Sequence, residues 1–345
     1  MRIPIVSKDV WRDLYEVAGQ FRALSPWKWM EDHEVFGVQS PVSDEIGYCV
    51  VLGTLGQVLG LCMYRGSKGL AFHQRIAAEE MSMDDFVGEQ DYLMVEFVAK
   101  AELEREDKKV ISDLGFRYRG EKQYPKFRSS LPGYCPWFLT EPEAQFLDFA
   151  LHCAIDAARH RREDPTYFQS ERGAEYLVYI PGERGGGSYS FSKSWQKPAP
   201  LPLPEVPLPK AEIKEITRHE LGRDSIWEAD FFFLPRAIQD RDRPYFARTI
   251  MIAQQPTGMI LSMEAIAPEE NLYAAVENEI LSIINATGLL PKQLHVQDEV
   301  LVRAIEPFAQ ALGFRVILKE RLPALSEARE ELKQALRSGF FPRKS

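Results

Sequence analysis

The stretch Leu312-Gly313-Phe314-Arg315 repeats, residue for residue, the earlier stretch Leu114-Gly115-Phe116-Arg117. The two copies lie 198 positions apart (312 − 114), and four further identities share that spacing. These are Trp29 with Trp227, Asp32 with Asp230, Gly60 with Gly258, and Pro125 with Pro323. Scattered identities at one spacing indicate a duplicated unit. The sequence therefore predicts two diverged copies of one fold, with the glycine of each copy ending a helix.

The second half shows which fold the repeated unit has. Three strands are predicted at residues 225–234, 245–253 and 258–265, after a short helix at residues 211–221. Helices at residues 271–287, 298–312 and 326–337 then alternate with strands at residues 293–297 and 314–319. This order matches the α+β ribonuclease H-like fold, in which the first strand of an antiparallel meander pairs in parallel with strand four.

The first half follows the same β-β-β-α-β-α-β-α plan with additions. Its strands are predicted at residues 29–38, 48–52, 58–64, 92–98 and 116–120. A long helix begins at Thr140, where Glu143 completes a capping box, and a hairpin covers residues 176–180 and 189–195. We therefore expect an N-terminal domain at residues 1–195 and a C-terminal domain at residues 211–345.

Between these domains lies Pro198-Ala199-Pro200-Leu201-Pro202-Leu203-Pro204-Glu205-Val206-Pro207-Leu208-Pro209. Proline fixes φ and removes a backbone donor at nearly every second position, which favours an extended polyproline segment. We interpret residues 196–210 as a proline-rich linker. Its interleaved apolar side chains predict that it lies against a domain surface.

Composition excludes several classes of function. The 345 residues are 45% hydrophobic, which is typical of globular domains, and the formal net charge is −9. An acidic chain disfavours nucleic acid and anionic membranes as partners. The cysteines have no C-x-x-C spacing and lie in apolar segments, and the start resembles no signal peptide, so we expect reduced thiols and a cytoplasmic location.

The last part of the chain resembles a known family. The matching stretches are Leu294-His295-Val296-Gln297-Asp298, Leu312-Gly313-Phe314-Arg315-Val316 and Leu322-Pro323-Ala324-Leu325-Ser326-Glu327-Ala328. They resemble uncharacterised bacterial domains that follow a second domain of unknown function. The resemblance implies a bacterial, cytoplasmic protein without an assigned function, and it carries no catalytic residues.

The ribonuclease H-like fold suggests one chemical hypothesis. Active members hold two magnesium ions with carboxylates from strand one, the first helix, the end of strand four and the last helix. Here those places offer Asp230, Glu277 or Glu279, Asp298, and Glu327, Glu330 or Glu331. A nuclease that uses Mg²⁺ or Mn²⁺ is therefore one interpretation.

Other features of the sequence weaken the nuclease hypothesis. The chain has 51 acidic residues, so chance matches are easy, and Asp298 is well placed to cap a helix. Asp230 is followed by three phenylalanines, and Lys100 stands where Asp298 would have its counterpart (298 − 198). We therefore expect no catalytic, cofactor or metal site, and favour a binding or scaffolding module with a protein partner as one option.

Two further surfaces are candidates for binding. The run Arg159-His160-Arg161-Arg162, with Arg117, Arg119, Lys122, Lys126, Tyr118 and Tyr124, suggests a nucleic-acid face, although a solvated helix end explains the run more simply. Trp29 and Trp227 suggest a small-ligand cleft between the domains, although both tryptophans also suit a core. Substrate, partner and oligomeric state are not predicted.

Overall fold

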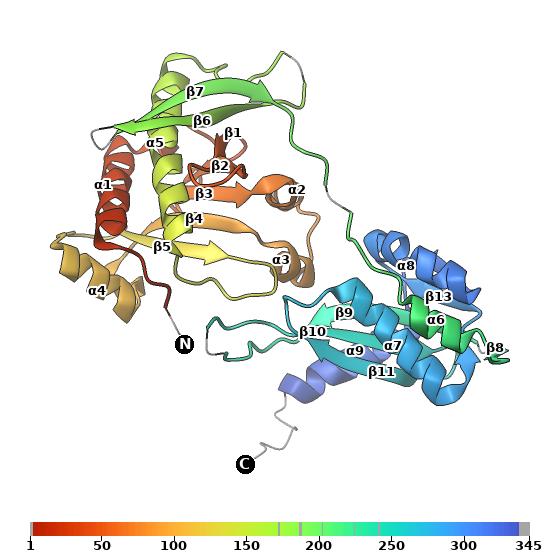
Figure 1. The fold of residues 1–345 in the computed structure, drawn as a ribbon. Coiled ribbons are helices and arrows are strands. Elements are labelled where there is room, and N and C mark those ends of the chain that lie inside the picture. Colours follow the sequence, from red (N-terminus) through yellow and green to blue (C-terminus); the bar gives the residue numbers. More distant parts are fainter. Residues whose placement is uncertain are drawn as a thin grey trace. The chain divides into compact units, whose positions relative to one another are not determined.

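The computed structural model describes residues 3–171, 173–185, 188–201, 203–223, 225–240 and 242–337. The chain divides into two compact units, with the main division between residues 201 and 203 and with residues 242 and 243 grouped with the first unit. Each unit has its own sheet and its own core (Figure 1). Across the described ranges, no helix is long and apolar enough to cross a membrane.

A seven-stranded sheet forms the centre of the N-terminal unit, in the order β5-β4-β3-β2-β1-β6-β7. Neighbouring strands are antiparallel except β1 and β6, which are parallel. The strands are β1 (Val35–Gln39), β2 (Ile46–Leu52), β3 (Gly60–Arg65), β4 (Tyr92–Val98), β5 (Tyr124–Ser130), β6 (Tyr176–Gly185) and β7 (Ser188–Gln196).

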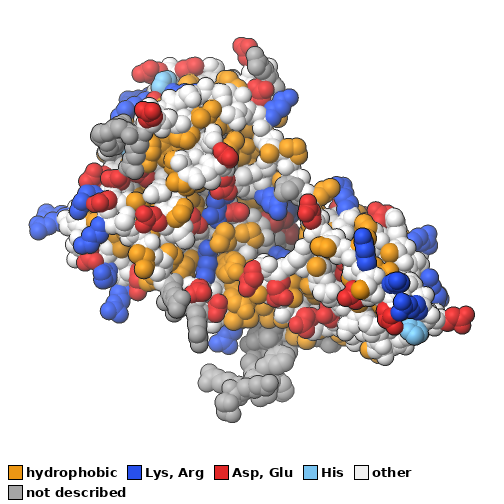
Figure 2. Space-filling view, viewed as in Figure 1, with side chains coloured by type: hydrophobic (Ala, Val, Ile, Leu, Met, Phe, Trp, Pro, Cys, Tyr) orange, Lys and Arg blue, Asp and Glu red, His pale blue; other side chains and the backbone are white. Residues whose placement is uncertain are grey.

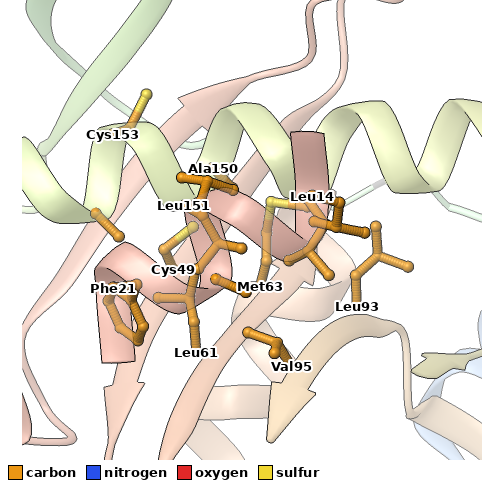
Figure 3. Packing of buried hydrophobic residues seen from close by; sticks show 14 of the residues in the cluster. Leu14, Phe21, Cys49, Leu61, Met63, Leu93, Val95, Ala150, Leu151 and Cys153 are labelled. Atoms are coloured by element: carbon orange, nitrogen blue, oxygen red, sulfur yellow. The ribbon is translucent and has the colours of Figure 1, made fainter. Parts of the chain in front are cut away.

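Helices cover both faces of this sheet. Helices α1 (Lys8–Leu24) and α5 (Glu141–Glu163) lie side by side on one face, where side chains such as Leu14, Met63 and Leu151 meet (Figures 1 and 3). Helix α2 (Gly66–Ala77) packs on the other face against alternate residues of β2 and β3, and α3 (Met83–Glu89) contacts α2. Two short 3-10 helices, η1 (Pro26–Lys28) and η2 (Lys100–Glu102), and helix α4 (Arg105–Leu114) complete the unit.

The C-terminal unit has a five-stranded sheet in the order β11-β10-β9-β13-β14. Strands β9 (Ile226–Phe233), β10 (Arg248–Gln254) and β11 (Met259–Ile266) form an antiparallel meander. Strand β13 (Gln293–Val296) pairs in parallel with both β9 and β14 (Arg315–Leu318). This is the predicted ribonuclease H-like strand order, so the fold class is confirmed for this unit.

Helices again lie on both faces of the second sheet. Helices α7 (Leu272–Thr287) and α8 (Glu299–Leu312) share one core with β9, β10 and β13, and α9 (Pro323–Arg337) packs on the opposite face. The C-terminal unit also contains a short helix, α6 (Lys210–Ile216), and a small sheet in which β8 (Gly222–Arg223) pairs with β12 (Leu289–Leu290). Just before α6, Leu208 packs against the α7–α8 core, and the described residues 203–209 have no helix or strand.

The prediction of the same sheet in the first half is wrong. Strand β4 pairs antiparallel with β3, and β6 of the extra hairpin takes the parallel place beside β1. The strand predicted at residues 116–120 does not form, because β5 already fills the free edge of β4 from Tyr92↔Ser130 to Val98↔Tyr124. The alternation in that segment instead reflects burial: Phe116 and Tyr118 pack on the core, and Arg117 and Arg119 are exposed.

Candidate functional site

Asp230 lies on β9 and faces α9. Its Oδ2 atom accepts from Arg329 Nη1 on α9 at 3.2 Å, and its Oδ1 atom accepts from the backbone N–H of Phe231 at 2.8 Å. The guanidinium of Arg329 also lies 4.9 Å from the ring centre of Phe232. The carboxylate predicted for strand one is therefore neutralised by an arginine of the last helix.

Asp298 occupies the N-cap position of α8. Its Oδ1 atom accepts from the backbone N–H of Leu301 at 2.8 Å, so it satisfies one of the unpaired donors of the first turn. Arg248 of β10 also interacts with Asp298: burial lowers the pKa of the guanidinium, and the charges of Tyr273 and Asp298 act in the opposite direction. Arginine keeps its proton at neutral pH, so Asp298 also has a cation of the protein nearby.

The predicted helix carboxylates have different surroundings. Glu277 on α7 is 2% exposed, and burial raises its pKa to about 7, so a large share of it is protonated at neutral pH. Glu279 accepts a hydrogen bond from Ser262, and Glu327 is exposed on α9. The side chains of Glu330 and Glu331 lie outside the described residues.

The described carboxylates of this set do not form one cluster. Asp230 faces α9 on one side of the sheet, and Asp298 begins α8, which packs on the other side. In the part of the chain that the structure describes, no three His, Cys, Asp or Glu side chains are grouped so that they would hold a metal ion. The contacts of Asp230 and Asp298 tie helices to the sheet, and the described side chains offer no grouped ligand set for a divalent cation.

Sequence reasoning missed Glu228, which is completely buried in the middle of β9. Its Oε2 atom accepts from the backbone N–H of Leu325 in the first turn of α9 at 3.0 Å, and its Oε1 atom accepts from Gln255. A carboxylate suits this place because the N-terminal end of a helix is positive. The signal in the sequence was a second carboxylate beside Asp230 in a strand that is otherwise apolar, since a buried glutamate needs partners.

The basic run at the end of α5 is used inside the N-terminal unit. Arg161 forms an ion pair with Glu34, and the Arg162 guanidinium lies 5.1 Å from the ring centre of Trp29. His160 Nδ1 lies 3.3 Å from Asp156 Oδ2. These contacts agree with the simpler interpretation of the run as a helix end.

Both tryptophans proposed for a cleft also have contacts within their own units. Trp29 Nε1 donates to the carbonyl of Ala158 at 3.0 Å, and Trp227 is 1% exposed in the core of the C-terminal unit. Their positions are explained by packing.

Three hollows of the N-terminal unit differ in charge. Two adjacent ones, with volumes of about 540 and 450 Å³, share His33 and His73 and are lined by acidic side chains that include Asp32 and Glu175. Burial lowers the pKa of His73, which favours its neutral form. A further hollow of about 540 Å³ lies beside α4, and the described residues that line it include basic side chains but no acidic ones.

Comparisons with known proteins agree with two separate domains. Residues 11–179 match the family model described as "Domain of unknown function (DUF7309)", and residues 212–333 match "Domain of unknown function (DUF6930)". A comparison with curated proteins gave no match.

Among solved structures, the chain is similar to the catalytic core domain of BIV integrase, with 18% identity and a TM-score of 0.24 over 33% of this chain and 69% of that one. It is also similar to the HTLV-2 integrase catalytic core domain in complex with magnesium, with 13% identity and a TM-score of 0.25 over 36% and 80%. Likenesses this slight transfer no residue role to this chain. The protein carries two different domains of unknown function in tandem.

Proposed function

We propose that this protein is a non-catalytic binding or scaffolding module whose C-terminal domain keeps a ribonuclease H-like frame without two-metal chemistry. The observation that carries the proposal is the contact of 3.2 Å between Arg329 and Asp230. A cation of the protein already lies on the carboxylate that strand one would offer to a metal.

Electrostatics supports this proposal. Mg²⁺ needs a near-octahedral set of oxygens at about 2.1 Å, and carboxylates supply its protein ligands. Two like unit charges about 4 Å apart repel by about 4 kcal/mol at an effective dielectric constant near 20, and a divalent ion beside a guanidinium meets a larger repulsion. A metal at Asp230 would therefore require Arg329 to leave its position.

A nuclease assay of the full chain tests the proposal. Labelled single- and double-stranded DNA and RNA are incubated with the protein and Mg²⁺ or Mn²⁺, and we expect no cleavage above the protein-free control. Asp298→Asn is the matched variant, because asparagine caps a helix as well as aspartate does but lacks the charge. Metal-dependent cleavage that this folded variant loses would establish the alternative, a nuclease that uses Asp230, Glu277, Asp298 and Glu327.

We also place the protein in the bacterial cytoplasm and assign residues 196–210 the role of linker between a domain at residues 1–195 and one at residues 211–345. Support for the location comes from the cysteines: all four are free, and Cys49, Cys62 and Cys153 are buried. Support for the linker is that the described residues 203–209 form neither helix nor strand. Limited proteolysis that cuts first in this segment would support the linker role.

A further inference from the structure

The hollow beside α4 has a size suited to a small ligand. Its volume is about 540 Å³, within the range of about 300–1,000 Å³ that is usual for ligand sites. Its walls come from η2, from Lys108, Ile111 and Ser112 of α4, and from residues 116–119, the segment that was predicted to be a strand. The departure from the expected fold therefore forms one wall of the hollow.

Four cations line this hollow: Lys100, Lys108, Arg117 and Arg119. All four are exposed, and the described residues offer none of them an ion pair. Figure 2 shows Lys and Arg side chains along the edge of the N-terminal domain where Figure 1 places α4. Four cations without a described ion pair around one hollow are unexpected in a protein with a net charge of −9.

The acidic residues of the same segments have other partners. Glu102 accepts from the backbone N–H of Ala99 at 2.9 Å, and Glu104 pairs with Arg128 at 2.8 Å. Asp113 pairs with Lys109 at 2.6 Å. These three acids are therefore engaged elsewhere, and the described residues that line the hollow include no acid.

Aromatic rings line the same hollow. The ring of Phe116 lies 6.1 Å from that of Tyr118 with an angle of 21° between planes, and Tyr118 lies 5.5 Å from Tyr124. The Tyr124 hydroxyl donates to the carbonyl of Tyr118 at 2.8 Å, and Arg22 Nε donates to the carbonyl of Lys122 at 2.7 Å. These contacts hold the segment in place before any ligand arrives, which lowers the entropic cost of binding.

We infer that this hollow binds a nucleotide, either free or as a unit of a short single strand. Arginine and lysine recognise phosphate through charge-assisted hydrogen bonds, and aromatic side chains stack on bases. The overall negative charge disfavours a long polyanion, so the ligand is small. This inference rests on the proposed function, because it names the class of ligand that the proposed binding module would take.

Titrations of the full chain test the inference. The probes are ATP, adenosine, inorganic phosphate and a five-nucleotide single-stranded DNA, each followed by calorimetry at 50 and 200 mM NaCl. We expect ATP to bind more tightly than adenosine or phosphate, and to bind at least tenfold more weakly at the higher salt concentration. If the oligonucleotide binds more tightly than ATP, the ligand of this hollow is a short single-stranded nucleic acid and not a free nucleotide.

Substitutions of residues around the hollow test whether ATP binds there. Arg117→Glu with Arg119→Glu exchanges two exposed charges, so we expect a folded protein with at least a hundredfold loss of ATP affinity. Lys108→Ala should weaken binding about tenfold, and its neighbour Lys109→Ala, whose charge is paired with Asp113, is the matched control without effect. No ATP binding at millimolar concentration, or equal binding by the double charge reversal with an unchanged circular dichroism spectrum, overturns the inference.

The two proposals fail in different ways. Metal-dependent cleavage that Asp298→Asn abolishes removes the non-catalytic proposal and leaves the ATP titration as it is. A failed ATP titration removes the nucleotide site alone.

Discussion

The two copies of Leu-Gly-Phe-Arg form the same helix cap and then diverge. Gly115 ends α4 with φ of +79°, and Gly313 ends α8 with φ of +74°. In both copies the glycine N–H donates to the carbonyl three residues earlier, and the phenylalanine N–H to the carbonyl five residues earlier. These four residues therefore specify the end of a helix in both units.

The course of the chain beyond each cap depends on the neighbouring strand. After Gly313 the chain enters β14 and pairs in parallel with β13, and Phe314 is 4% exposed. After Gly115 the edge of β4 is already taken by β5, so the segment turns away and lines the basic hollow, and Phe116 is half-buried. The four-residue motif therefore specifies the end of the helix. Whether the next segment forms a strand depends on whether the neighbouring strand has a free edge.

Truncation of the two phenylalanines gives the largest contrast. Phe314→Ala should destabilise the C-terminal unit by about 3–5 kcal/mol, because it leaves a cavity in a packed core. Phe116→Ala should cost the N-terminal unit about 1–2 kcal/mol, since that ring is partly solvated. Hydrogen exchange followed separately in each unit measures both losses, and equal losses would contradict the comparison.

A pH effect of intermediate size distinguishes the two units. The folded state raises the pKa of Glu277 from 4.5 to about 7, so it binds more protons than the unfolded chain in that window. Stability of the C-terminal unit should therefore fall as the pH rises from about 4.5 to 7, and Glu277→Gln should remove this slope. Glu79, which lies 198 positions earlier (277 − 198), is exposed, and Glu79→Gln serves as the control without effect. An identical slope in wild type and Glu277→Gln, measured by urea unfolding, refutes the assignment.

The two cap glycines should respond alike. Gly115→Ala and Gly313→Ala force a side chain into the left-handed region and should each cost about 1–2 kcal/mol. An added Cβ meets nothing within 4 Å at Gly115 and only the flexible Arg223 side chain, at 3.2 Å, at Gly313. Thermal unfolding checks the pair, and a difference larger than about 1 kcal/mol would show that the caps are not equivalent.

The arginines of the two copies should give the smallest change in stability. Arg117 and Arg315 are both exposed, so each replacement by alanine should shift stability by less than about 0.5 kcal/mol. Only Arg117→Ala should reduce the rise in melting temperature that ATP produces. A similar reduction in Arg315→Ala would mean that ATP acts elsewhere.

The C-terminal fold was predictable because each of its elements has a clear pattern and its strands occur in the order of a known topology. The first sheet was not, since nothing local in Tyr92–Val98 tells whether it pairs with β3 or β1. Asp298 was recognised as a cap from its position before an apolar run. The Arg329 contact of Asp230 joins residues 99 positions apart, which no local pattern encodes.

The basic hollow beside α4 was also only partly predictable from the sequence. Arg117, Tyr118, Arg119 and Tyr124 were singled out from the sequence as a basic and aromatic stretch. Their arrangement around a hollow with Lys100 and Lys108 depends on the missing strand, and only the structure reveals it.

Manganese binding tests the central claim most directly. The full chain is titrated with Mn²⁺ and the free ion is measured by electron paramagnetic resonance. We predict that the signal of free Mn²⁺ equals that of buffer, because Arg329 and the helix cap occupy the carboxylates. Stoichiometric Mn²⁺ binding that Asp230→Asn abolishes, in a variant with an unchanged circular dichroism spectrum, would contradict the account.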